Sequence, residues 1–138
     1  MYDRAVEIDE AIAAGHRALD ALAEAADSLD SAKRWGIVDI LGGGFLTSVV
    51  KHSRLGDANR ELARAREEIS AFTREISDVR DLDMLNADVG GLNTFFDIAM
   101  DNMLVDIFVQ KDISDAEDRV EEATAWVREA LSRLEACR

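Results

Sequence analysis

The sequence predicts an all-α protein built as an elongated helical bundle. Three observations support this fold class. The 138 residues contain no proline, the residue that most strongly interrupts a helix. In three long segments, apolar or small residues recur at alternating steps of three and four, which is the heptad pattern of packed helices. Hydrophobic residues make up 48% of the chain, which at this length predicts a single domain over residues 1–138 with a buried core.

We expect three long helices separated by two short apolar helices. In chain order they cover residues 2–34, 37–51, 57–81, 93–110 and 113–137. A helix of about 30 residues spans roughly 45 Å, which is longer than the core of a small globular domain is wide. The bundle is therefore expected to be elongated, with its long helices side by side and antiparallel where the connections allow.

The first long helix is predicted from one unbroken heptad series. Its members are Ala5, Ile8, Ile12, Gly15, Leu19, Leu22, Ala26 and Leu29. Several of them are small, so a neighbouring helix can approach closely at these positions. We expect Trp35-Gly36 to end this helix, because glycine is the usual residue just past a helix C-terminus.

The first short helix, 37–51, contains three consecutive glycines, Gly42–Gly44. Each glycine weakens a helix by about 1 kcal/mol relative to alanine. The run therefore predicts a break, a kink or a close approach of another backbone. A polar turn follows, and Asp57 is the expected N-cap of the second long helix.

The second and third long helices have heptad series that coincide when shifted by 58 residues. The earlier series is Ala58, Leu62, Ala65, Ile69, Phe72, Ile76 and Val79. The later series is Ala116, Val120, Ala123, Val127, Ala130, Leu134 and Cys137. The same shift brings Asp39 onto Asp97, which predicts an internal duplication with repeated units at 36–82 and 94–138. Convergent helical-hairpin design remains the alternative, because any two heptad helices can be brought into phase.

Charge and cysteine content exclude several classes of protein. The formal net charge of -13 argues against binding to nucleic acid or to an anionic membrane, since both need a cationic surface. A single cysteine, Cys137, cannot form an intramolecular disulfide. Residues 1–30 are charged throughout and contain no apolar block of the kind found in signal peptides. We therefore expect a cytoplasmic protein.

No catalytic or nucleotide-binding motif is recognisable. The residues after Gly44 are Phe45-Leu46-Thr47-Ser48, so the lysine that a P-loop needs at this spacing is missing. His52 has no nucleophile beside it in the sequence, and Cys137 lies one residue from the end of the chain. We predict that the protein is not an enzyme and needs no cofactor.

A weak metal site is the main chemical alternative. Asp97 and Asp101 lie four residues apart and therefore on one face of the second short helix. The Glu-x-x-His motif of di-metal helical bundles is absent, and a solvated face is the favoured explanation of the two carboxylates. If they bind an ion, it is Ca²⁺ or Mg²⁺, because hard cations accept oxygen ligands alone.

The two short apolar segments predict an interaction surface, because their apolar area exceeds what one chain of this design covers. A basic turn that starts at Lys51-His52 adds cations, which mainly suit a helix C-terminus and alternatively a phosphate or an acidic segment of a partner. The candidate interaction residues are Asp39, Gly42, Gly43, Gly44, Phe45, Lys51, His52, Phe95, Phe96, Met100 and Met103.

We therefore predict a non-enzymatic helical protein–protein interaction or structural module that forms homo-oligomers. The alternative is a small-ligand or divalent-metal-binding helical protein that uses the acidic residues of the 93–110 helix. A third hypothesis, insertion of the glycine-bearing helix into a membrane surface, is disfavoured by the net charge.

One block of the sequence resembles a known group. Residues 35–44 read W-x-x-x-D-x-L-G-G-G and are followed by Lys51-His52-Ser53. In these features the chain resembles a group of uncharacterised bacterial all-helical proteins, over about residues 30–138. The resemblance implies a helical fold, and it implies no activity.

Overall fold

The computed structural model describes residues 3–42, 45–79, 91 and 113–138. These residues form three long helices, α1 (Arg4–Gly42), α2 (Phe45–Ser77) and α4 (Ile113–Cys137). Within the described ranges there is no β-strand. The predicted all-α fold class is confirmed.

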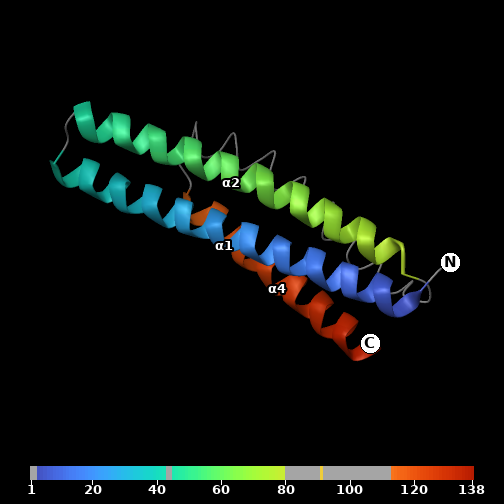
Figure 1. Ribbon diagram of the computed structural model, residues 1–138. Helices are drawn as coiled ribbons and strands as arrows, with labels where there is room; N and C mark the ends of the chain where they lie inside the picture. Colours follow the sequence, from blue (N-terminus) through green and yellow to red (C-terminus); the bar gives the residue numbers. More distant parts are fainter. Residues whose placement is uncertain (1–2, 43–44, 80–90, 92–112) are drawn as a thin grey trace.

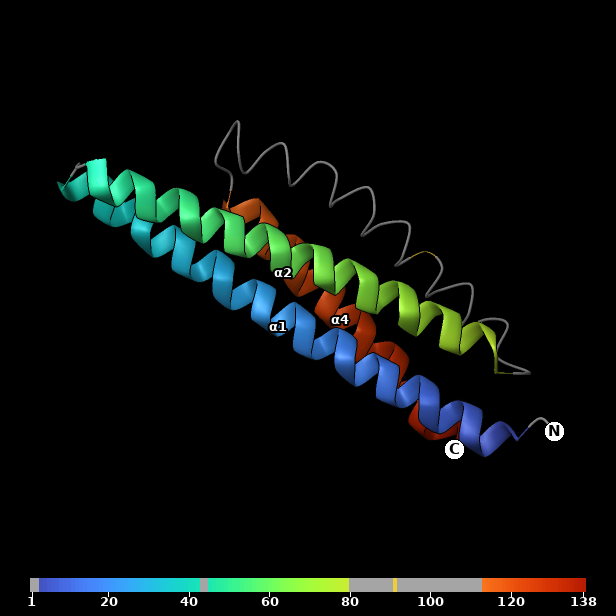
Figure 2. The same cartoon turned by 45° about the horizontal axis from the view of Figure 1, so that its top comes forward.

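α1 is the central element, and both other helices pack against it. α1 and α2 form an antiparallel hairpin, and α4 runs along a different side of α1 (Figures 1 and 2). α4 is antiparallel to α1, because Lys33 pairs with Glu117 near the start of α4, whereas Asp9 pairs with Arg138 at its end. The described helices make an elongated body, as their lengths predict.

Two predicted helix boundaries are wrong. α1 continues without interruption through Trp35-Gly36 to Gly42, and α2 continues through Gly56 and Asp57. A single glycine costs a helix about 1 kcal/mol, which continued helical packing on either side can outweigh. Asp57 consequently lies inside α2, where its carboxylate pairs with Arg60 instead of capping a new helix.

The glycine run divides the two helices. α1 ends at Gly42 and α2 begins at Phe45, which agrees with the predicted break at this run. Three consecutive glycines cost a helix about 3 kcal/mol in total, so they stop it where a lone glycine does not. The short helix predicted over 37–51 is therefore wrong as a separate element: its residues end α1 and begin α2.

The second short helix, 93–110, lies outside the described residues. The 58-residue duplication consequently stays a prediction, although the first proposed unit, 36–82, begins inside α1 and not at a helix start.

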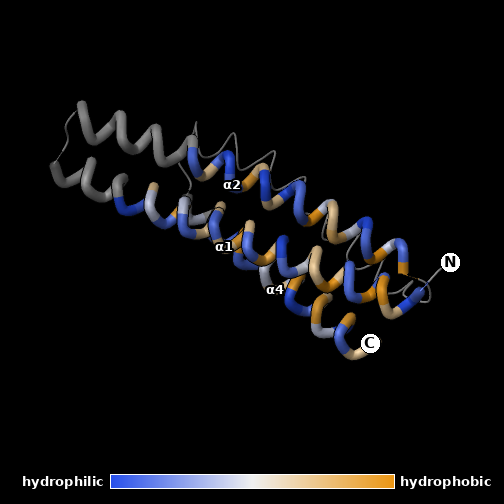
Figure 3. Tube along the Cα trace, in the orientation of Figure 1, coloured by the Kyte–Doolittle hydropathy of each residue, from blue (hydrophilic) through white to orange (hydrophobic). Residues whose placement is uncertain are grey.

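The core follows the predicted heptads closely in two of the three helices. All seven positions predicted for the second long helix are buried, including Val79 just past the end of α2. Six of the seven positions predicted for α4 are buried, and Cys137 is partly buried. Figure 3 shows the corresponding alternation of hydrophobic and hydrophilic residues along the helices.

α1 buries more than its predicted series. Of that series, Ile8, Gly15, Leu22 and Leu29 are buried, Ile12, Leu19 and Ala26 are partly buried, and Ala5 is exposed. A second set of α1 residues is fully buried: Ala11, Ala14, Ala18, Ala21, Ala25 and Ala32. The reason is that α1 has two helical neighbours, so it needs two apolar faces.

Side chains of α2 and α4 meet over α1 at Gly15. A Cβ atom at this residue would lie 2.5 Å from Cδ2 and 2.9 Å from Cγ of Leu131 in α4. It would also lie 2.9 Å from Cε1 of Phe72 in α2. The side chains of Leu131 and Phe72 thus occupy the space that any larger residue would need, as expected for a small residue on a packing face.

Candidate functional site

Five of the predicted interaction residues come together at the end of the α1–α2 hairpin. Asp39 and Gly42 belong to the last turn of α1, and Phe45, Lys51 and His52 belong to the first turns of α2. Gly43 and Gly44 lie between these helices, outside the described residues. The remaining candidates also lie outside the described ranges: Phe95, Phe96, Asp97, Met100, Asp101 and Met103.

We call residues 35–42 of α1 and 45–52 of α2 the hairpin end. Among the described helices, only α1 and α2 reach it (Figures 1 and 2). Lys33 Nζ lies 3.6 Å from Glu117 Oε1, which fixes the register of α4 against α1. Beyond this ion pair α1 continues for nine residues, roughly 13 Å, whereas only four residues of α4, roughly 6 Å, precede Glu117.

The hairpin end is apolar and has no net charge. Nine of its 16 residues are apolar, and its charged residues are Asp39 and Lys51. The remainder of the chain therefore carries the whole net charge of -13. Such a segment is typical of a surface that is covered by another part of a protein.

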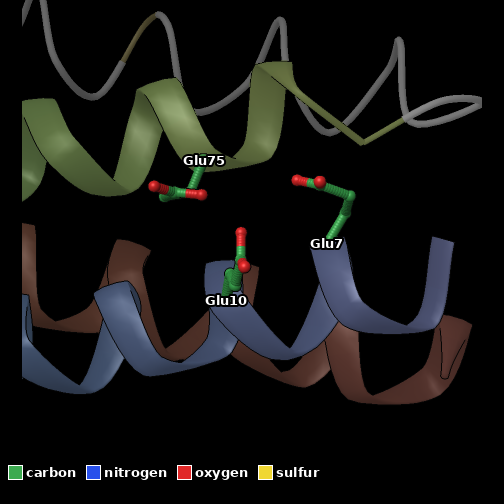
Figure 4. Close-up of side chains that lie close together, drawn as sticks. All are labelled: Glu7, Glu10 and Glu75. Atoms are coloured by element: carbon green, nitrogen blue, oxygen red, sulfur yellow. The ribbon is translucent and has the colours of Figure 1, made fainter. Parts of the chain in front are cut away.

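The opposite end of the hairpin holds a carboxylate cluster that was not predicted. Glu7 and Glu10, in the first turns of α1, face Glu75 in the last turn of α2 (Figure 4). One oxygen of each carboxylate lies within 4.8 Å of the other two. The spacing of Glu7 and Glu10 indicates one helix face, but only the pairing of α1 with α2 brings Glu75 to it.

The carboxylates of this cluster repel one another. Loss of solvent around Glu7, followed by the negative charges of Glu10, Asp78, Glu75 and Asp3, raises the pKa of Glu7. Glu75 is also placed unfavourably, since the C-terminal end of a helix carries the negative pole of its dipole. Asp3 has a second role, because the backbone N–H groups of Ala5 and Val6 donate hydrogen bonds to its Oδ1 and so cap α1.

Three carboxylate oxygens are ligands that Ca²⁺ or Mg²⁺ accepts. In the part of the chain that the structure describes, Glu7, Glu10 and Glu75 are the only group of three or more potential ligand residues close enough to hold an ion. Exposed acidic groups are common without a metal. The cluster by itself therefore assigns no metal site.

A second contact between carboxylates lies further along the α1–α2 interface. Arg64 Nη1 of α2 is 2.5 Å from Glu24 Oε2 of α1 and 3.9 Å from Glu61 Oε2. A hydrogen bond with Glu24 is the main cause that raises the pKa of Glu61, and Arg64 and Arg60 partly offset it. Here the Arg64 guanidinium offsets part of the negative charge, whereas no ion pair within the described residues does so for Glu7, Glu10 or Glu75.

The candidate catalytic groups do not converge. The guanidinium of Arg4 donates a hydrogen bond of 3.1 Å to the backbone carbonyl of Cys137, which places Cys137 beside the start of α1. His52 belongs to the hairpin end, at the other end of the body. His16 lies 12 residues along α1 from Arg4, roughly 18 Å away. The described geometry therefore contains no Cys–His pair.

Comparison with known proteins gives no relative: no family model, no curated protein and no solved structure matches the chain. The resemblance to bacterial helical proteins therefore stays a prediction. None of the helices in the described ranges combines the length and hydropathy needed to cross a membrane.

Proposed function

We propose that this chain is a non-enzymatic helical interaction module that self-associates through the hairpin end. The observation that carries the proposal is the reach of the α1–α2 hairpin past the start of α4. The residues in this projecting part are the least charged and among the most apolar of the described chain. Apolar surface of this kind gains free energy when a partner covers it.

The composition of the end of α1 supports the need for more than one neighbour. Four of the five residues 37–41 are apolar. A helix that packs one face against a core has apolar residues at about three of every seven positions. Full burial of one such aliphatic side chain contributes about 1.5–3 kcal/mol, so covering a few of them supplies the driving force for association.

The distribution of charge favours the hairpin end, and not the acidic remainder of the chain, as the contact between two copies. Two chains with a net charge of -13 repel each other, and the repulsion is strongest where their acidic surfaces meet. Asp39 and Lys51 cancel at the hairpin end, so two copies can meet there without bringing like net charges together.

The proposal is tested by the oligomeric state of a matched pair of variants. Val38→Glu places a charge in the hairpin end, and Val6→Glu makes the same change at a position that is 47% exposed near the start of α1. We expect analytical ultracentrifugation to show that wild type and Val6→Glu are oligomers, and that Val38→Glu dissociates at least tenfold more readily. A tenfold change corresponds to about 1.4 kcal/mol.

Circular dichroism of both variants separates lost association from lost folding. If Val38→Glu loses helical signal, the variant Val49→Lys, on the α2 side of the hairpin end, is used for the test in its place. A wild type that is monomeric at all accessible concentrations overturns self-association. A Val38→Glu variant that stays folded and oligomeric would show that the interface lies outside the hairpin end.

The alternative, a divalent cation on Asp97 and Asp101, concerns residues outside the described ranges and stays a prediction. Native mass spectrometry of the same sample reads subunit number and any retained Ca²⁺ or Mg²⁺ together. A stoichiometric ion that is lost when both aspartates are changed to alanine would replace the interaction-module proposal.

A further inference from the structure

We draw no further inference here: the strongest candidate, the carboxylate cluster of Glu7, Glu10 and Glu75 where the start of α1 meets the end of α2, is an acidic cluster beside which nothing in the described part of the chain points to a ligand.

Discussion

The two ends of the α1–α2 hairpin differ in how their residues are brought together. The hairpin end consists of residues close in sequence on either side of the glycine run, and it is apolar and uncharged overall. The opposite end joins Glu7 and Glu10 to Glu75, at least 65 residues away, in a cluster of like charges. A surface made of neighbouring residues is visible in the sequence, whereas one made of distant residues requires the register between helices.

The largest loss of unfolding free energy is expected for a substitution in the packed core between the two ends of the hairpin. Phe72→Ala removes a fully buried ring that lies against Gly15, and we expect it to cost about 3–5 kcal/mol of unfolding free energy. Val38→Ala, at the hairpin end, should cost less than half as much if that end is an interaction surface and not part of the core. Chemical denaturation under conditions that favour the monomer measures both. Equal losses would mean that the hairpin end is part of the core.

The second largest loss of unfolding free energy is expected for a substitution of Gly15. Gly15→Ala should lower the unfolding free energy by about 1–3 kcal/mol, because its Cβ would overlap Leu131 and Phe72. The gain in helix propensity of about 1 kcal/mol offsets part of this loss, so a net loss of up to about 2 kcal/mol is expected. Gly91→Ala is the control, since no atom from elsewhere in the described part of the chain lies within 4 Å of a Cβ there. A thermal shift that is equal for the two variants would argue against the close approach of the three helices at Gly15.

A smaller effect is expected from Asp3, which both caps α1 and adds to the charge of the acidic end. Asp3→Ala should cost about 0.5–1 kcal/mol through loss of the cap. Asp3→Asn retains a capping oxygen and removes the negative charge, so it should be neutral or slightly stabilising. Thermal denaturation at low ionic strength measures the difference. An Asp3→Asn variant as destabilised as Asp3→Ala would show that charge, and not the cap, is what α1 needs there.

The smallest effect is the pH dependence of the acidic end. The pKa of Glu7 is raised in the folded state above its ordinary value of 4.5, so the folded protein binds this proton more tightly than the unfolded chain does. Its negative charge therefore destabilises the fold at neutral pH, and the penalty is relieved as the pH falls through the raised pKa towards 4.5.

Glu7→Gln should accordingly raise the melting temperature slightly at pH 7, with the gain shrinking as the pH approaches 4.5. Glu67→Gln, at an exposed position of α2, is the control, and we expect it to change stability little at any pH. A gain from Glu7→Gln that is constant across this range, or a loss at pH 7, would contradict the repulsion between the carboxylates.

Much of the core was predictable because helical packing repeats locally. Leu62, Ile69 and Ile76 of α2 were assigned to the buried face from spacing alone, and all are fully buried. For α1 the same reasoning found only part of the core. The buried alanines such as Ala14 and Ala21 form a second stripe. One heptad series identifies one packing face, so it does not reveal that α1 lies between two other helices.

One of the two candidate sites was likewise predictable from local sequence, and the other was not. The hairpin end could be predicted from its apolar composition and its glycines, although the predicted short helix proved to be the two ends of longer ones. The acidic cluster could not be predicted, because Glu75 is far from Glu7 in the sequence and no local spacing pattern links the two residues.

By itself the sequence determined the helical fold class and the buried faces of α2 and α4, and it marked the glycine run as a place where a helix is weakened, since propensity and periodicity act over a few neighbouring residues. Tertiary structure alone decided that α1 lies at the centre, that it continues past Trp35, and that Leu131 and Phe72 meet over Gly15. These features depend on which distant side chains fill the same space, and that is settled only when the helices pack.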